Sequence, residues 1–140
     1  YILMHMQGTP ETMQKNPNYK NIIQEITYYF SERINALRKK GVIDIIIDPG
    51  FGFGKTLEHN YEILGKLNKL QLLNAPILVG ISRKSMVYKL LKVSPQESLN
   101  GTIAANIIAL QNGATILRVH DVKEAAECAK LDNKTSMRKN

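Results

Sequence analysis

The sequence has no tryptophan and only one cysteine, Cys128, among its 140 residues. A single cysteine cannot form an internal disulfide, so nothing points to an oxidising compartment, and we expect Cys128 to be a buried or half-buried helix residue. No apolar run approaches the roughly 20 residues that cross a bilayer. No charged leader precedes an apolar segment at the start. We therefore predict a soluble, cytoplasmic protein that does not act at a membrane.

Three common site motifs are also missing. A P-loop needs a glycine five residues before its Gly-Lys pair, and the segment Gly54–Thr56 has Pro49 at that place. The dinucleotide fingerprint would need a third glycine at Lys55 if it began at Gly50. No Gly-x-Ser-x-Gly elbow is present, and Ser82 has basic neighbours rather than a histidine. These absences argue against a P-loop protein, a Rossmann dinucleotide site and a serine hydrolase.

The three histidines, His5, His59 and His120, do not have the spacing of metal ligands, so we predict no metal site built by this chain. We expect His5 to be a core histidine whose ring is satisfied by the backbone, and His59 to be solvated. His120 fits an ordinary loop residue and a ligand-binding residue equally well.

Positive charge is in excess, with 19 Lys and Arg against 12 Asp and Glu, a net charge of +7. The basic residues are scattered, apart from Arg38–Lys40 and the last residues of the chain. Arg38–Lys40 closes a predicted helix, where cations suit the helix dipole. An anionic small substrate is therefore a better use of the charge than a nucleic acid, and we predict no nucleic-acid partner.

Apolar strand patterns alternate four times with helical patterns, which predicts an α/β fold with a parallel sheet. The predicted strands end near Met6, Asp48, Ile81 and Val119, and two capping boxes, Ser94–Glu97 and Asp121–Glu124, are predicted to begin helices. We predict residues 1–131 to be the C-terminal half of a (β/α)8 TIM barrel, about its last four β/α units, and residues 132–140 to be a disordered polar tail. The chain begins inside a strand pattern, so we expect a piece of a longer protein.

The stretch Ile43–Thr56 is the centre of this pattern. An isoleucine-rich strand, expected to be buried on both faces, ends in Asp48, and glycines alternate with Phe51 and Phe53 behind it. Glycine allows positive φ and close approach of a ligand, and a phenylalanine ring offers a flat apolar wall. The stretch predicts a site for a planar ligand that donates hydrogen bonds to an acid, although the glycines could instead merely turn the chain.

Polar side chains collect at the carboxyl ends of all four predicted strands. They are His5, Asp48, Ser82 with Lys84, and Arg118 with His120. In a TIM barrel this end of several strands holds the active site, whereas a doubly wound sheet binds at one switch point, so the pattern favours the barrel. An internal network of ion pairs is the alternative explanation of these charges.

Four motifs in this order resemble those of the dihydropteroate synthases, a family that sulfonamides target. They are LMHMQGTPETMQ (Leu3–Gln14), DPGFGFGK (Asp48–Lys55), GISRKS (Gly80–Ser85) and RVHDV (Arg118–Val122). The resemblance implies a TIM barrel that joins a dihydropterin diphosphate to p-aminobenzoate, both small-molecule substrates, in folate synthesis. It implies a cytoplasmic homodimer, and it implies that the isolated chain, with half of the site, is inactive.

The resemblance implies a role for each motif. The pterin would be bound by Asp48, Lys84, Arg118 and Gly80, the p-aminobenzoate by Phe53 and Ser82, and the diphosphate by Arg118 and His120. Of these, Lys84, Arg118 and His120 would be catalytic. Mg²⁺ would arrive with the diphosphate, and its protein ligand is expected outside this chain.

Two other functions stay open at this point. A pterin-binding methyltransferase of the methyltetrahydrofolate–corrinoid type would share the strand-end acid, but it has no diphosphate to hold. A truncated, non-catalytic half-barrel would only bind pterin.

Overall fold

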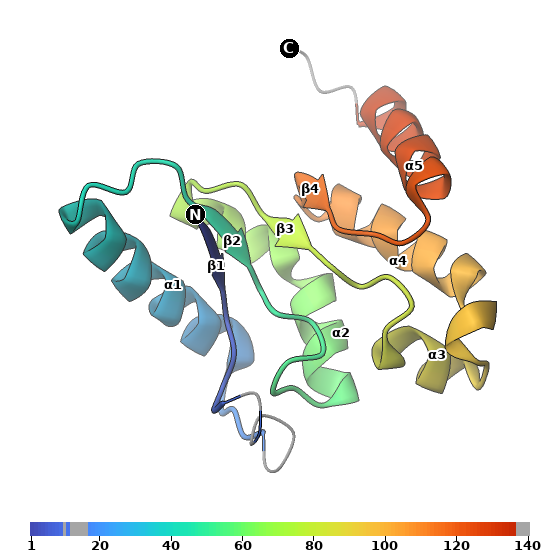
Figure 1. Ribbon diagram of the computed structural model, residues 1–140, viewed down its shortest axis with the longest axis horizontal. Helices are drawn as coiled ribbons and strands as arrows, with labels where there is room; N and C mark the ends of the chain where they lie inside the picture. Colours follow the sequence, from blue (N-terminus) through green and yellow to red (C-terminus); the bar gives the residue numbers. More distant parts are fainter. Residues whose placement is uncertain (10, 12–16, 137–140) are drawn as a thin grey trace.

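Four parallel strands alternate with helices in the computed structural model (Figure 1). The structure describes residues 1–9, 11 and 17–136. The strands are β1 (Ile2–Met4), β2 (Ile46–Asp48), β3 (Leu78–Val79) and β4 (Ile116–Leu117). The helices are α1 (Ile22–Lys39), α2 (Leu57–Gly65), α3 (Ser85–Leu91), α4 (Leu99–Gln111) and α5 (Val122–Thr135), with 3₁₀ segments η1 (Leu67–Leu73) and η2 (Pro95–Glu97). This order confirms the predicted alternation of strands and helices.

The strands lie side by side in chain order. β1 pairs with β2 and β3 pairs with β4, and a parallel bridge between Ile47 and Ile77 joins the two pairs. Because all pairings are parallel, the four carboxyl ends meet at one edge of the sheet. The side chains that follow each strand are thereby brought together.

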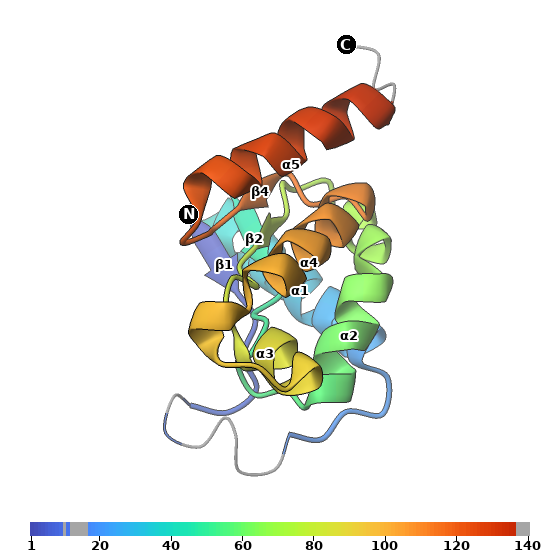
Figure 2. The ribbon, with the colours of Figure 1, turned by 90° about the vertical axis from the view of Figure 1, so that its right-hand side faces the viewer.

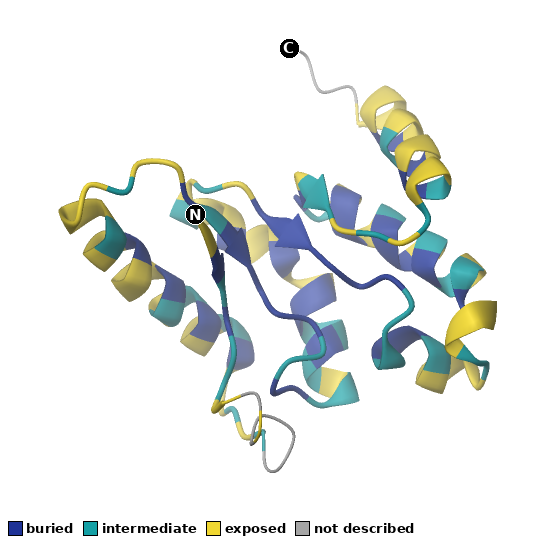
Figure 3. Ribbon diagram, in the orientation of Figure 1, coloured by how far each residue is buried: buried dark blue, intermediate teal, exposed yellow. Residues whose placement is uncertain are grey.

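The helices cover one face of the sheet, as the two perpendicular views show (Figures 1 and 2). Side chains alternate between the faces of a strand. Ile47 and Val79 are fully buried in the core between sheet and helices, whereas Asp48 and Gly80 are next in sequence and lie on the other face. The buried surfaces face inward and the outer helix surfaces are exposed (Figure 3). In these strands, residues at odd-numbered positions thus face the core, and residues at even-numbered positions face the site.

Helix α1 shows how the sequence builds this core. Its N-cap Asn21 accepts a hydrogen bond from the Gln24 amide at 3.1 Å, which satisfies one of the free amides of the first turn. Its buried residues are Ile22, Ile26, Phe30 and Ile34, spaced at four residues along one stripe. Gly41, with a φ of +86°, follows its end. The prediction that Arg38–Lys40 closes a helix is confirmed.

Several predicted boundaries are wrong. The strand expected over residues 43–48 begins only at Ile46, and Ile43 is 87% exposed, because residues 43–45 lead from helix to sheet instead of pairing throughout. Helix α5 runs past Leu131 to Thr135 and buries Asp132, so the first four residues of the predicted tail are helical. Residues 137–140 lie outside the described residues.

Two predictions from composition can be compared with the structure. Cys128 is buried on α5, as expected. Among the described helices, none is both long and apolar enough to cross a bilayer.

Candidate functional site

Asp48 and Arg118 meet across the sheet although 70 residues separate them. An Arg118 guanidinium nitrogen donates to Asp48 Oδ2 at 3.0 Å, and the side chain of Asp48 is 1% exposed while that of Arg118 is 51% exposed. Gly80 lies between their strands, and a Cβ at that position would come within 2.8 Å of the guanidinium. The missing side chain of Gly80 therefore leaves room for the ion pair.

The glycine loop after β2, residues Gly50–Gly54, is held against Asp48. The Gly50 amide donates to Asp48 Oδ1 at 2.9 Å, so both carboxylate oxygens accept a charge-assisted bond. Gly50 and Gly52 have φ angles of +73° and +82°, as the sequence predicted. A Cβ at Gly50 would overlap the carbonyl of His5, so only glycine fits there.

The two phenylalanines of this loop have different environments. Phe51 is fully buried in the core and forms no wall of an open site. Phe53 is half-buried, and the Lys84 Nζ lies 4.8 Å from the centre of its ring. This cation–π contact places the Phe53 ring beside Lys84, and its role as an aromatic wall for a ligand stays a prediction.

Lys84 reaches from the N-terminus of α3 into the same region. Its Nζ donates to the Phe51 carbonyl at 2.7 Å. Burial lowers the pKa of Lys84 to about 8, with Asp48 opposing and Arg118 adding to this shift. An ammonium beside an aromatic ring, an acid and a guanidinium can donate to acceptors of a planar ring.

Ser82 and His120 form a second pair at the ends of β3 and β4. Ser82 Oγ lies 2.9 Å from His120 Nδ1 and accepts a bond from the His120 amide at 3.2 Å. Ser82 is buried and His120 is exposed. The serine therefore orients the imidazole, which leaves Nε2 as the ring nitrogen for a ligand.

Arg83 and Asp121 were not expected to pair. Arg83 makes two parallel hydrogen bonds to the Asp121 carboxylate, of 2.9 and 2.8 Å, and also donates to the carbonyls of Pro95 and Gln96. The predicted capping box at Asp121 is wrong, since its side chain caps nothing, because the guanidinium offers a stronger two-bond partner than a helix amide. This cluster ties the two strand-end loops together behind Ser82 and His120.

Lys55 was not predicted to belong to the site, and its Nζ donates to three backbone carbonyls. The acceptors are Phe53 at 2.9 Å, Gly50 at 3.0 Å and His5 at 3.4 Å. Lys55 is 4% exposed, and burial lowers its pKa to about 7. Its sequence signal is weak, since a lysine that follows a glycine loop is normally solvated.

The remaining histidines differ from their predictions in part. His5 is buried, as expected, and its ring packs edge-on against Tyr29 on the helix side of the sheet. Its Nδ1 has no hydrogen-bond partner among the described residues, so the expected satisfaction by the backbone is not seen. His59 is half-buried rather than fully solvated, and it closes a capping box with Thr56 at the start of α2.

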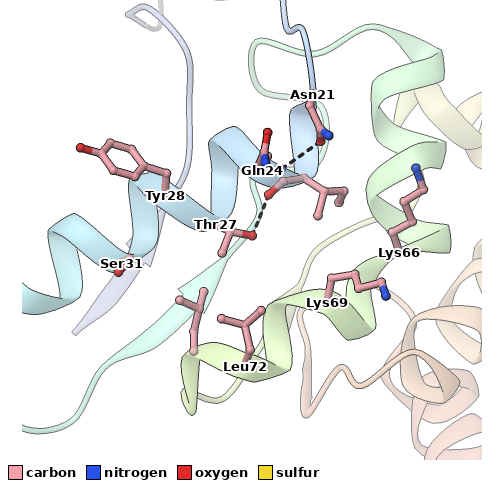
Figure 4. Close-up of a pocket in the computed structure, with 10 residues that line it drawn as sticks. Asn21, Gln24, Thr27, Tyr28, Ser31, Lys66, Lys69 and Leu72 are labelled. Carbon is pink, nitrogen blue, oxygen red and sulfur yellow. Dashed lines mark hydrogen bonds between the residues drawn. The ribbon is translucent and has the colours of Figure 1, made fainter.

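A groove of about 650 Å³ lies between α1 and η1, away from the strand ends (Figure 4). Leu72 and Leu73 supply apolar surface, and Lys66 and Lys69 lie along one side. The described residues that line the groove include no histidine, cysteine or carboxylate. The groove thus offers no acid–base pair, and the reactive side chains remain those at the strand ends.

The structure brings together Asp48, Phe53, Gly80, Lys84 and Arg118, with Ser82 and His120 alongside. The His5 ring packs against Tyr29 instead, although the His5 amide donates to the Asp48 carbonyl at 2.9 Å. No group of three His, Cys, Asp or Glu side chains among the described residues could hold a metal ion. Part of the motif Leu3–Gln14 lies outside the described residues.

The chain is similar to known proteins over most of its length. A family model described as "Pterin binding enzyme" matches residues 1–120. Dihydropteroate synthase from Escherichia coli K12 is 48% identical over 131 residues, which cover 92% of this chain and 46% of that protein. The chain thus spans about half the length of the curated relatives it matches.

Solved structures give the same result. Yersinia pestis dihydropteroate synthase, in a sulfonamide drug complex, matches with a TM-score of 0.94 and 44% identity, covering 99% of this chain and 51% of that one. The synthase from Thermus thermophilus in complex with 6HMPPP matches with a TM-score of 0.91 and 34% identity, covering 96% of this chain and 55% of that one. The same enzyme was solved with 4-aminobenzoate.

Proposed function

This chain belongs to the family of pterin binding enzymes, and from this premise we propose that it carries the strand-end half of a dihydropteroate synthase site. Its fold is the predicted part of a TIM barrel, the fold of these relatives. The proposed reaction joins a 6-hydroxymethyl-dihydropterin diphosphate to p-aminobenzoate and releases diphosphate. The observation that carries the proposal is the Asp48–Arg118 pair over Gly80, with Lys84 beside it.

The pterin would bind across this pair. Asp48 would accept from the amino and N3 edge of the ring, since each carboxylate oxygen can accept more than the one bond it has here. Lys84 donates one bond to the Phe51 carbonyl and can direct its other N–H groups at ring acceptors. Arg118, half exposed above Gly80, would cover one face of the ring.

The diphosphate would lie between Arg118 and His120. Both side chains are exposed at the same edge of the sheet, and Ser82 holds the His120 ring in place. Two donors fixed before the substrate arrives stabilise negative charge on the departing diphosphate without reorganisation. The p-aminobenzoate would lie along Phe53 and Ser82.

The chemistry needs no nucleophile from the protein. The C–O bond between the pterin methylene and the diphosphate would break largely before the arylamine nitrogen attacks. The C–N bond then forms and the amine loses a proton, so that catalysis consists of positioning and charge stabilisation. This agrees with a site that has arginine, lysine and histidine at its centre.

Mg²⁺ enters the proposal only with the diphosphate. Both Asp48 oxygens accept bonds from Arg118 and Gly50, and Asp121 is bound by Arg83. These acids do not form a Mg²⁺ site, so we assign no step to the metal here. A homodimer and a cytoplasmic location are further parts of the proposal that rest on the family resemblance.

The test uses a hybrid enzyme in which this chain replaces the matching segment of the E. coli relative. The expected result is diphosphate release that requires both the pterin diphosphate and p-aminobenzoate, and that falls at least tenfold in Arg118→Ala. Pterin binding without release would favour a binding-only protein, and methyl transfer from a folate to a corrinoid would favour the methyltransferase. Either result would overturn the proposed synthase activity.

A further inference from the structure

Lys55 is a buried cation surrounded by backbone carbonyls. All three N–H groups of its Nζ are directed at carbonyl oxygens, those of Phe53, Gly50 and His5. None of the ion pairs among the described residues includes Lys55. Burying an ammonium is unfavourable unless its donors are satisfied, so the three carbonyls are what keeps the charge in this place.

Two of these carbonyls belong to the glycine loop. The loop runs from Gly50 to Gly54, and its glycines have no side chains to hold a shape by packing. Lys55 connects the start of the loop at Gly50 to Phe53 near its end, and connects both to the end of β1 through the His5 carbonyl. The ammonium thus links both ends of the loop to β1. These contacts offset the large loss of conformational entropy when the glycines of the loop become ordered.

The loop in turn carries two groups that Lys84 contacts. The Phe51 carbonyl accepts from Lys84 Nζ at 2.7 Å, and the Phe53 ring lies 4.8 Å from the same nitrogen. Lys55 therefore touches the proposed p-aminobenzoate wall only through the backbone. Of the proposed pterin residues, Gly80 and Arg118 lie on other strands, whereas Asp48 accepts from the Gly50 amide and Lys84 donates to the Phe51 carbonyl. The loop therefore contacts residues of both proposed subsites.

We propose that Lys55 is a positioning residue, whose ammonium fixes the glycine loop so that Phe53 forms the wall of the p-aminobenzoate site and Lys84 keeps its contacts with the loop. This inference rests on the proposed function for the identity of the second substrate. The effect on the loop itself does not depend on that function.

The charged and titratable groups that face Lys55 come from three elements. Asp48 at the end of β2 attracts the ammonium, Lys84 before α3 repels it, and His5 after β1 packs beside it. Burial and the nearby Lys55 lower the pKa of His5 to about 3, so this ring is neutral at physiological pH. Asp48 is therefore the one group of these three that favours the charged form of Lys55.

The functional test compares Lys55→Met with wild type in the hybrid enzyme. Methionine has a similar length but no donor. We expect the KM for p-aminobenzoate to rise at least tenfold, and the dissociation constant of the pterin diphosphate to rise by a smaller factor, because Gly80 and Arg118 lie outside the loop. A merely structural role would lower kcat through loss of folded protein and leave both constants unchanged. The matched control is Lys89→Met, an exposed lysine that lines the same cavity of about 180 Å³ as Lys55.

The second test measures amide hydrogen exchange in this chain and needs no activity. The amides of Gly50, Gly52 and Phe53 all donate hydrogen bonds within or beside the loop. In Lys55→Met we expect them to exchange at least tenfold faster, with the amides of α1 unchanged. Lys55→Arg should behave like Lys55→Met, because a planar guanidinium cannot meet three carbonyls placed around one nitrogen.

The outcomes separate the two proposals. An inactive wild-type hybrid together with faster loop exchange in Lys55→Met would refute the synthase and keep the role of Lys55 in the loop. Unchanged loop exchange, or an unchanged KM in an active Lys55→Met hybrid, would overturn the inference about Lys55.

Discussion

Gly80→Ala tests the geometry of the site with a single methyl group. A Cβ at Gly80 would lie 2.8, 3.2 and 3.3 Å from three atoms of the Arg118 guanidinium. The backbone at Gly80 does not have a positive φ, so alanine adds no backbone strain. The methyl group must therefore push the guanidinium away from Asp48, because that side chain is the part that can move.

Gly80→Ala should lower the free energy of unfolding only slightly and should weaken pterin binding strongly. Displacing Arg118 removes one bond from a carboxylate that is 1% exposed, which costs about 1–3 kcal/mol. Alanine also lowers the conformational entropy of the unfolded chain, and this restores about 0.4–1 kcal/mol of stability. We expect a net destabilisation of about 0–2.6 kcal/mol from these two effects. Pterin binding should be at least tenfold weaker, since the ring would meet the added methyl group and a misplaced arginine.

Gly65→Ala is the matched control. Gly65 is the last residue of α2, and a Cβ there would meet no atom within 4 Å. Alanine in a helix is more favourable than glycine by about 1 kcal/mol, so the melting temperature should rise slightly and pterin binding should not change. Melting is followed by circular dichroism on this chain, and pterin binding by calorimetry on the hybrid enzyme. Pterin affinity within twofold of wild type in Gly80→Ala would refute the position of Arg118.

Three further predictions concern charge. Lys84→Ala should lower kcat of the hybrid enzyme more than tenfold without a loss of helical signal, and near-normal turnover would remove Lys84 from the site. The Arg83 guanidinium lowers the pKa of Asp121, so stability from this pair is present above the usual aspartate pKa and lost as the pH falls through the lowered one. In Asp121→Asn, the free energy of unfolding from urea titrations should fall less steeply as the pH is lowered. An unchanged pH dependence would show that the Arg83–Asp121 pair does not contribute to stability. The pKa of Lys55 falls from 10.5 to about 7, so the folded chain binds fewer protons than the unfolded chain between these values and the free energy of unfolding should rise with pH across them. At about 1.4 kcal/mol per pKa unit, the full effect of Lys55 is at most roughly 5 kcal/mol. Lys55→Met should reduce the slope, and an equal slope would show that folding does not lower the pKa of Lys55.

The order of elements could be predicted because it depends on local patterns. The stripe of Ile22, Ile26, Phe30 and Ile34 and the cap at Asn21 are properties of one helix, and the sequence around them predicts that helix without reference to any other element. Strand ends were less certain, since an apolar run such as Ile43–Ile47 does not reveal which residues pair with a neighbour. Pairing depends on partners far along the chain.

The site also depends partly on local sequence and partly on partners far along the chain. Asp48 and Arg118 could be assigned to one edge of the sheet from topology alone. The orientation of His5 toward the helices depends on its odd or even position relative to β1, which it follows, and the sequence alone does not define where that strand ends. The local sequence around Asp121 fits a helix cap, whereas the partner of Asp121 in the structure, Arg83, lies 38 residues away.

Glycines and lysines at this site have roles that are visible only in three dimensions. Gly80 matters through the guanidinium that occupies the space of its missing Cβ, and Gly50 through the His5 carbonyl beside it. Lys55 matters through carbonyls, which every residue has and no sequence pattern distinguishes. A sequence names the groups that can react with a ligand, but residues that only hold backbone in place leave no such signal, so the supporting shell of this site had to come from the structure.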